Sequence, residues 1–149
     1  MKPGDLAPDF TLPDQDGTDR LLSELLEGGP VVLFFYPGAM TRGCTAESCH
    51  FRDLAAEFAE AGAQRVGISL DDVATQKEFA ELNSFDYPLL SDADGEVAEQ
   101  FGVRRRVGAI PLKRHTFVIG TDRVVIEVIK SEFSMNAHAD KALKVLRKG

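Results

Sequence analysis

The apolar run VVLFFY at 31–36 is the feature that most constrains the fold of this chain. Its β-branched and aromatic residues follow one another without a polar break, which is typical of a strand that is buried on both faces of a sheet. Pro37 and Gly38 end the run. The run therefore predicts a central strand covered by other elements on either side.

Helical and strand-like segments alternate along the rest of the chain. Strands are predicted near 9–17, over 65–70 and 87–92, and in two closely spaced runs at 114–120 and 124–130; helices are predicted as a short turn within 18–30, from about 41–45 to Gly62, and over 71–82, 95–102 and 136–148. This order predicts an α/β layer fold with a parallel portion and a late antiparallel hairpin. Because no repeat or linker interrupts it, we expect one domain over 1–149.

The second helix, from about 41–45 to Gly62, is expected to be the longest. An apolar stripe at helical spacing predicts its core-facing side, and it consists of Phe51, Leu54, Ala55, Phe58 and Ala59. Gly62 provides a C-terminal stop. The start of this helix follows the most buried strand, and in α/β folds reactive groups gather where strands end and helices begin.

Composition excludes several classes of function. With 24 acidic and 17 basic residues the net charge is −7, which speaks against general nucleic-acid binding. No apolar run approaches the roughly 20 residues of a membrane span, and the opening MKPGDLAPDF has no secretory signal. We therefore expect a cytoplasmic protein. In a reducing compartment a close cysteine pair is more often catalytic, redox-active or metal-binding than a permanent structural disulfide.

The two cysteines, Cys44 and Cys49, both fall in the first turns of the helix that begins near 41–45. Free backbone N–H groups and the helix dipole stabilise an anion at Cys44, and Arg42 adds positive charge nearby. Cys44 lies almost two turns before Phe51, so we expect a partly sheltered thiolate at the floor of a cleft. Cys49 lies about 200° around the helix from Phe51 and should face elsewhere.

A disulfide between these cysteines conflicts with an intact helix. Residues five apart in an ideal helix have Cα atoms roughly 8.6 Å apart, whereas a disulfide requires about 4.4 to 6.8 Å. A Cys44–Cys49 bond therefore needs the first turns to unwind, and helix ends fray more readily than helix centres. We infer a local switch that is helical when reduced and unwound when oxidised.

Two other interpretations of the cysteines stay open on these residues alone. Both thiols could be inert core residues, because free cysteine is often buried. Zinc could be bound by Cys44, Cys49, His50 and either His115 or His138, although no short Cys-x-x-Cys knuckle is present. The same absence argues against dithiol exchange of the thioredoxin type.

A wider pattern around Cys44 is specific to one family. Pro37, Thr41 and Cys44 form Pro-x-x-x-Thr-x-x-Cys, the pattern of peroxiredoxins, and FFYPGAMTRGCTAESCHFRDL resembles the peroxiredoxin Q or bacterioferritin comigratory protein subfamily. The resemblance covers essentially the whole chain and includes GDLAPDFTLPDQDG, YPLLSD, VAEQFGV and RHTFVIG. It implies a thioredoxin-like fold with a central mixed sheet and helices on both faces.

The resemblance implies a thiol-dependent peroxidase that uses no bound cofactor or metal. Cys44 would be the peroxidatic cysteine, which attacks hydrogen peroxide or an organic hydroperoxide and becomes a sulfenic acid. Cys49 would be the resolving cysteine, which closes an intramolecular disulfide. Thioredoxin or a similar dithiol would then reduce that disulfide. Relatives suggest a monomer, with a dimer possible, and neither nucleic acid nor membrane is an expected partner.

The resemblance also assigns supporting roles. Thr41 would hydrogen-bond the thiolate and the peroxide, Pro37 would shield the sulfenic acid, and Arg114 would stabilise charge on sulfur and oxygen. Backbone N–H groups at Gly43 and Cys44 would assist, and Glu47 would orient an arginine. Each also has a plain structural interpretation, such as a helix cap for Thr41, a strand end for Pro37 or an exposed edge charge for Arg114.

Several features depart from the family or lie outside its pattern. Arg42 stands where many relatives have proline, and Gly120 where aspartate is common. Arg104, Arg105 and Arg106 are interpreted as a solvated loop or as a docking patch for an acidic reductant, and His138 as a surface or capping residue near Phe133 and Met135. Two rival functions share the cysteines: a redox-sensing interaction module, and a non-catalytic domain with inert thiols.

Overall fold

The computed structural model describes residues 1–105 and 107–148. Its centre is a five-stranded sheet in the order β5-β4-β3-β6-β7, built from β3 (Val31–Phe35), β4 (Gln64–Ser69), β5 (Leu89–Ser91), β6 (His115–Ile119) and β7 (Val125–Lys130). β3, β4 and β5 run parallel, whereas β6 is antiparallel to β3, and β7 to β6. The predicted mixed sheet with a late hairpin is confirmed.

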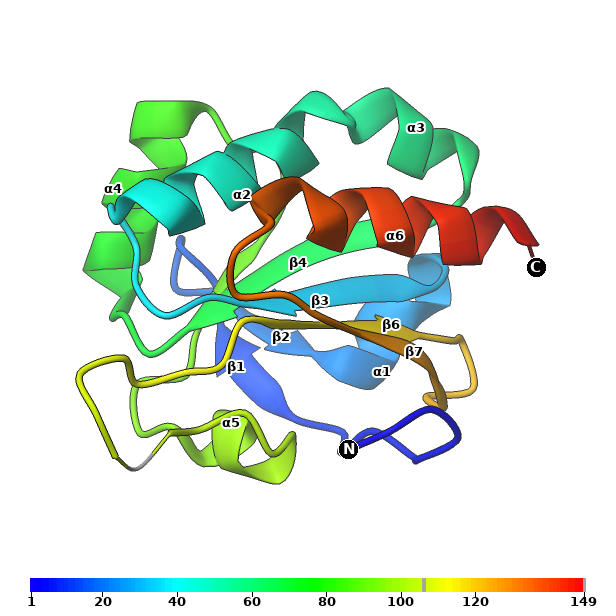
Figure 1. The fold of residues 1–149 in the computed structure, drawn as a ribbon, viewed down its shortest axis with the longest axis horizontal. Coiled ribbons are helices and arrows are strands. Elements are labelled where there is room, and N and C mark those ends of the chain that lie inside the picture. Colours follow the sequence, from blue (N-terminus) through cyan, green and yellow to red (C-terminus); the bar gives the residue numbers. More distant parts are fainter. Residues whose placement is uncertain (106, 149) are drawn as a thin grey trace.

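Helices cover both faces of this sheet (Figure 1). One face carries α2 (Arg42–Asp53), α3 (Ala55–Glu60), α4 (Val73–Asn83) and α6 (Met135–Lys148). The other carries α1 (Leu22–Leu25), the short 3₁₀ helix η1 (Leu26–Gly28), α5 (Glu96–Gln100) and the hairpin of β1 (Thr11–Pro13) and β2 (Asp19–Leu21). All five residues of β3 are buried, and they alternate between the two apolar clusters. This position explains the unbroken apolar run.

The helix predicted from about 41–45 to Gly62 is interrupted, so the single-helix prediction is wrong. Leu54 leaves helical geometry at φ −96° and ψ 21°, which separates α2 from α3. At this break an Arg65 N–H donates to the carbonyl oxygen of Phe51 over 3.0 Å, and a side chain thereby satisfies a helix-end carbonyl. The change of direction exposes Ala59, although Phe51 and Phe58 remain buried as predicted.

The short helical turn predicted within 18–30 is present as α1 and η1, but a strand that was not predicted precedes it. This strand is β2, which pairs antiparallel with β1. The carboxylate of Asp14 accepts hydrogen bonds from the backbone N–H groups of Asp16 and Thr18, and it contacts the Arg20 guanidinium at 2.9 Å. The Pro-Asp-x-Asp-Gly signal is therefore the turn of a hairpin.

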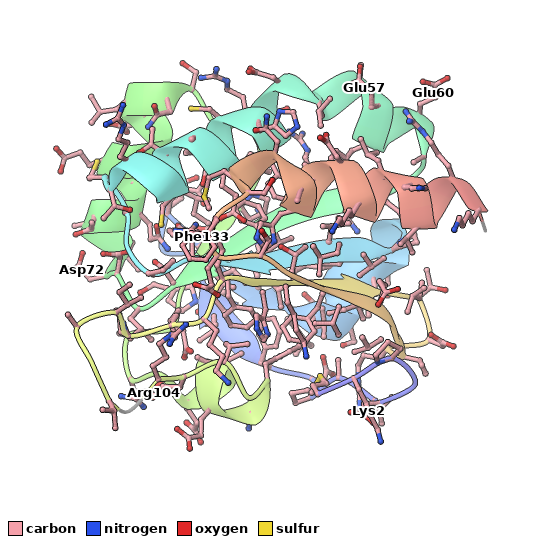
Figure 2. The ribbon with its side chains drawn as sticks, viewed as in Figure 1. Lys2, Glu57, Glu60, Asp72, Arg104 and Phe133 are labelled. Carbon is pink, nitrogen blue, oxygen red and sulfur yellow. The ribbon has the colours of Figure 1, made fainter. Side chains whose placement is uncertain are left out.

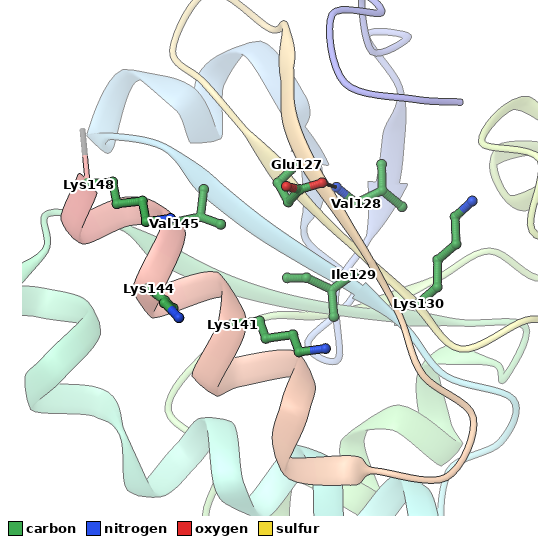
Figure 3. A pocket seen from close by; sticks show the side chains of 8 residues that line it. All are labelled: Glu127, Val128, Ile129, Lys130, Lys141, Lys144, Val145 and Lys148. Carbon is green, nitrogen blue, oxygen red and sulfur yellow. Dashed lines mark hydrogen bonds between the residues drawn. The ribbon is translucent and has the colours of Figure 1, made fainter.

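β7 is an edge strand, and together with α6 it lines a surface groove of about 390 Å³ (Figure 3). Four lysines line this groove: Lys130, Lys141, Lys144 and Lys148. Lysine at an exposed edge opposes pairing with another chain.

On the outer surface, Phe133 is 98% exposed just before α6 (Figure 2). Within the described residues, no helix combines the length and apolar character that a membrane crossing requires.

Candidate active site

Asp71 forms hydrogen bonds that fix the loop between β3 and α2. Its Oδ2 atom accepts hydrogen bonds from the backbone N–H of Ala39 and from the hydroxyl of Ser69, both at 2.7 Å. Met40 adopts φ 67°, a left-handed backbone that is uncommon for a residue with a side chain. The loop therefore has a specific shape, and that shape sets where α2 begins.

Cys44 is the third residue of α2, so the predicted position at a helix N-terminus is confirmed. Its exposed fraction is 0%, and it belongs to the apolar cluster that also holds Phe34 and Phe51. The expectation of a partly sheltered sulfur at the floor of a cleft is therefore wrong for this state. The sulfur is inaccessible to solvent because the apolar side of α2 packs against the sheet.

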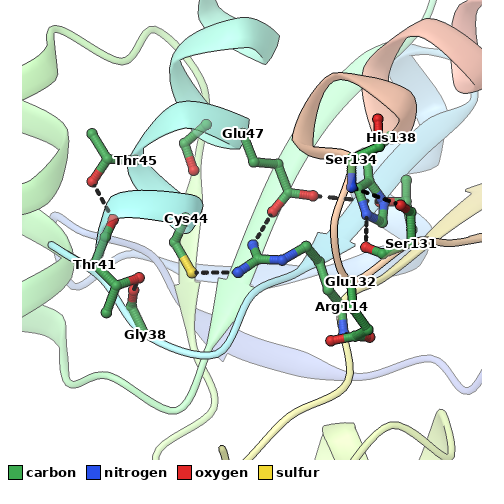
Figure 4. Close-up of polar contacts among 12 residues, drawn as sticks. Gly38, Thr41, Cys44, Thr45, Glu47, Arg114, Ser131, Glu132, Ser134 and His138 are labelled. Carbon is green, nitrogen blue, oxygen red and sulfur yellow. Dashed lines mark hydrogen bonds and ion pairs between the residues drawn. The ribbon is translucent and has the colours of Figure 1, made fainter.

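Arg114 contacts Cys44 directly from the residue before β6 (Figure 4). Its Nη2 atom lies 3.3 Å from Sγ of Cys44, and its Nη1 atom donates to Oε1 of Glu47 over 2.7 Å. The Arg114 backbone N–H donates to Oε2 of Glu132 at 2.9 Å. Arg114 is only 7% exposed, so the interpretation as an exposed edge charge is wrong. A permanent cation beside a buried sulfur favours its thiolate.

Glu47 lies three residues after Cys44 on the same side of α2 and has an exposed fraction of 0%. Burial raises the pKa of Glu47 to about 8, although Arg114 acts in the opposite direction. Its Oε1 atom binds Arg114, whereas its Oε2 atom accepts no hydrogen bond. The predicted contact between Glu47 and an arginine is present.

His138 is buried, with an exposed fraction of 0%, so its interpretation as a surface or capping residue is wrong. Nε2 lies 2.7 Å from the carbonyl oxygen of Ser131, and Nδ1 lies 2.7 Å from the hydroxyl of Thr116. Nδ1 is also 3.6 Å from Oε2 of Glu47. The sequence held a signal for this burial, because His138 starts an apolar stripe that continues at Ala142 and Val145.

Thr41 and Pro37 flank the start of α2, and neither forms a hydrogen bond with the Cys44 sulfur. Thr41 occupies the N-cap position, but its side chain makes no cap hydrogen bond. Its hydroxyl instead donates to the carbonyl oxygen of Gly38 over 2.7 Å. Thr41 is exposed and Pro37 is half-buried. Gly43 lies beside Arg114 and Met135, either of which would come within 3.4 Å of an added Cβ atom.

Cys49 faces a different part of the molecule from Cys44, as predicted. It is half-buried, and its Sγ lies 3.7 Å from Oδ1 of Asn83 at the end of α4. Both cysteines are free thiols. Because an intact helix holds residues five apart at roughly 8.6 Å between Cα atoms, a bond between the two sulfurs requires α2 to unwind.

The residues considered for zinc do not converge. His50 pairs with Asp140 at 2.7 Å, and His138 faces Thr116 and Ser131. Over 1–105 and 107–148, no group of three or more histidine, cysteine or acidic side chains could hold a metal ion.

In the arginine-rich loop, Arg104 donates to the carbonyl oxygen of Asp94 and Arg105 lies 3.7 Å from Glu132. Arg106 lies outside the described residues, and the docking role stays a prediction.

A buried thiol against an arginine, at the start of a helix that packs on a mixed sheet, defines a thiol-based oxidoreductase of the α/β class. Comparison with known proteins then gives the family. The AhpC/TSA family profile matches residues 3–128. The crystal structure of the peroxidoxin BcpB from Mycobacterium tuberculosis superposes with a TM-score of 0.96 at 67% identity, covering 99% of this chain and 97% of that one.

More distant relatives agree. The chloroplastic peroxiredoxin Q of Oryza sativa subsp. japonica is 41% identical over 97% of this chain and 66% of its own length. The structure of Xanthomonas campestris peroxiredoxin Q gives a TM-score of 0.87 at 30% identity, covering 97% of this chain and 95% of that one. The chain belongs to the AhpC/TSA family. The resemblance to peroxiredoxin Q and the thioredoxin-like fold are confirmed, and the protein is a thiol-dependent peroxidase.

Proposed function

We propose that this protein reduces hydrogen peroxide and organic hydroperoxides with Cys44, that Cys49 closes an intramolecular disulfide, and that thioredoxin reopens it. The observation that carries the proposal is the 3.3 Å contact between Arg114 and Cys44 in a buried site. This contact supports a Cys44 sulfur that is held as an anion. It also places the Arg114 cation where negative charge develops during the reaction.

In the first step, the Cys44 thiolate attacks one oxygen of the peroxide. An S–O bond forms, the O–O bond breaks, and the departing oxygen takes a proton to leave as water or an alcohol. Sulfur loses two electrons and the peroxide gains them. Arg114 and the backbone N–H groups of Gly43 and Cys44 would stabilise the negative charge that moves from sulfur to oxygen.

Thr41 and Pro37 would act on the bound peroxide. The Thr41 hydroxyl donates to Gly38 in the present state, and rotation about its χ1 bond would redirect that proton toward sulfur or peroxide. Pro37 follows shortly after β3, and its ring would limit the access of water to the sulfenic acid. These two roles rest on the family pattern and on proximity along the chain.

In the second step, the Cys49 sulfur attacks the sulfenic acid, an S–S bond forms, and water leaves. This step needs the N-terminal part of α2 to unwind, because the two sulfurs face different neighbours. A dithiol such as thioredoxin then supplies two electrons and two protons and becomes a disulfide itself. We expect one domain and a monomer to suffice for this cycle, since both cysteines lie on one chain.

Thioredoxin-coupled peroxide consumption tests the proposal with two matched serine variants. Cys44→Ser should abolish consumption, because the attacking sulfur is gone. In Cys49→Ser, one equivalent of peroxide should still oxidise Cys44 to a sulfenic acid, but turnover with thioredoxin should stall. Full activity of Cys44→Ser would refute the assignment of the nucleophile, and full thioredoxin-coupled activity of Cys49→Ser would refute the resolving role.

The closed state of Cys44 favours one alternative, a redox-sensing module in which the unwinding of α2 signals to a partner. Such a protein needs no fast catalysis. Quenched-flow measurement of Cys44 oxidation separates the two functions, because a sensor reacts with peroxide orders of magnitude more slowly than a dedicated peroxidase. Thiols that stay unmodified in dilute peroxide would instead indicate a non-catalytic domain.

A further inference from the structure

One buried cation faces two acids in this site. Arg114 contacts the Cys44 sulfur with one nitrogen and the Glu47 carboxylate with another, and both acidic residues are fully buried. If both were anionic, the cluster would carry an uncompensated negative charge in a poorly solvated place, which is costly. Cys44 and Glu47 therefore compete for Arg114.

The hydrogen bonds of His138 fix which of its ring nitrogens carries the proton. Nε2 faces the carbonyl oxygen of Ser131, which can only accept, so Nε2 must carry the hydrogen. Burial lowers the pKa of His138, which keeps the ring neutral. In a neutral ring Nδ1 is then an acceptor, and the Thr116 hydroxyl donates to it.

This tautomer decides what Glu47 meets on its second side. Nδ1 of His138 lies 3.6 Å from Oε2 of Glu47, the contact drawn between these residues in Figure 4. In this tautomer Nδ1 presents a lone pair rather than an N–H group, and Oε2 accepts no hydrogen bond. A buried carboxylate with one oxygen unsatisfied is a poor anion, because desolvation is not offset there. Glu47 is thereby made the weaker of the two competitors for Arg114.

The other charged groups around this pair come from three parts of the chain. Glu132, in the segment between β7 and α6, acts on both Glu47 and His138. Lys141 of α6 and Arg114 act on His138. Glu132 opposes ionisation of Glu47 further, and Arg114 is the cation that favours it. His138 is the neighbour that reaches the unpartnered oxygen itself.

We propose that His138 is a positioning residue for the peroxidase reaction. By presenting a lone pair rather than an N–H donor to Oε2 of Glu47, His138 disfavours the Glu47 anion, and so leaves the positive charge of Arg114 to the Cys44 sulfur. The proposal rests on the proposed function of Cys44. It gives α6, which contributes no atom to the reaction, control over the reactivity of α2.

The rate of Cys44 oxidation by hydrogen peroxide, measured from about pH 5 to about pH 9, tests this role. Quenched flow with thiol alkylation and mass detection follows a single oxidation. His138→Asn places an amide near the Nδ1 position, where its N–H can donate to Glu47. The Glu47 carboxylate should then hold Arg114 more strongly, and the rise of the rate with pH should move to higher pH, with a loss of about threefold or more at neutral pH.

Two further variants keep the test decisive. His138→Gln retains a donor for Ser131 and removes the Nδ1 acceptor, so it should shift the profile in the same direction even if His138→Asn folds poorly. In a Glu47→Gln background, substitution of His138 should shift the profile no further, because no carboxylate remains to compete. If His138 had only a structural role, its substitution would lower the rate of Cys44 oxidation equally in the parent and in the Glu47→Gln background.

His50→Gln is the matched control, because His50 also joins α2 to α6 but through exposed Asp140. Its profile should superpose on that of the parent. Unchanged profiles in both His138 variants, or equal shifts with and without Glu47, would overturn the proposal while leaving peroxidase activity intact. A parent protein that does not react with peroxide would instead refute the proposed function itself.

Discussion

The hydroxyl of Tyr87 donates a hydrogen bond to the carbonyl oxygen of Ser48 over 2.7 Å, one residue before Cys49. Burial raises the pKa of Tyr87 well above its ordinary value, so the hydroxyl remains a donor. The bond joins α2 to the segment that leads into β5. It lies in a part of α2 that would have to unwind for Cys49 to reach Cys44. Tyr87 thus opposes unwinding of the helix from its far side.

Tyr87→Phe should speed disulfide closure after a single oxidation. Loss of the bond should lower the free energy of unfolding by about 1 kcal/mol, and it should raise the resolution rate up to about fivefold if the bond breaks before the sulfurs meet. Tyr36→Phe is the control, because Tyr36 donates its hydrogen bond to Gln76 of α4 rather than to a group of α2. Equal resolution rates in the two variants would show that the Tyr87 bond survives closure.

Substitution of Arg114 should separate charge from geometry. Arg114→Met removes the cation and both contacts, and the rate of Cys44 oxidation should fall by about 100-fold, as when an oxyanion donor is lost. Arg114→Lys keeps the charge but cannot reach Cys44 and Glu47 as a fork, so an intermediate rate is expected. Single-turnover oxidation measures both. A rate for Arg114→Met within about threefold of the parent would contradict the role of the cation.

Glu47 should make stability depend on pH. Because the pKa of Glu47 is raised to about 8 in the folded protein, the folded state binds a proton that the unfolded chain releases above its ordinary carboxyl pKa. The stability contributed by that proton is complete at acid pH and is lost as pH rises toward 8. The free energy of unfolding of Glu47→Gln, relative to the parent, should therefore increase with pH by at least about 1 kcal/mol. Denaturant titrations that find a constant difference would contradict the raised pKa.

Asp71 should matter for rate through the loop that precedes α2. Asp71→Ala removes the acceptor for the Ala39 N–H, and the misplaced helix start should slow Cys44 oxidation by about tenfold. Asp72→Ala is a close control, because Asp72 only caps α4 through the Thr75 N–H. It should cost about 1 kcal/mol of stability and leave the rate unchanged. Similar rates in the two variants would mean that the loop keeps its shape without Asp71.

Local sequence patterns predicted the sheet and the placement of Cys44 well. The apolar run that forms β3 has only one comfortable location, between two apolar layers, and the Pro37–Gly38 stop fixes where the chain turns toward α2. The opposed directions of Cys44 and Cys49 follow from helical periodicity alone. The proximity of Arg114, which is 70 residues from Cys44, came from the family pattern, because no local rule brings β6 to α2.

The errors share a physical cause, since each depends on a partner distant in the chain. The break at Leu54 coincides with a hydrogen bond from Arg65 on β4, which periodicity within 41–62 cannot reveal. His138 is polar, so propensity assigns it to the surface, whereas Thr116 and Ser131 satisfy both of its nitrogens inside the core. The full burial of Cys44 likewise depends on how closely α2 packs against the sheet.

Intact-mass measurement after one equivalent of hydrogen peroxide tests the central claim most directly. The account predicts a loss of about 2 Da for the parent, which is the two hydrogens removed on disulfide closure, and a gain of about 16 Da for Cys49→Ser, which retains the sulfenic oxygen. Cys44→Ser should keep its mass. A parent that gains oxygen without losing hydrogen, or a Cys44→Ser protein that is oxidised at the same rate as the parent, would contradict it.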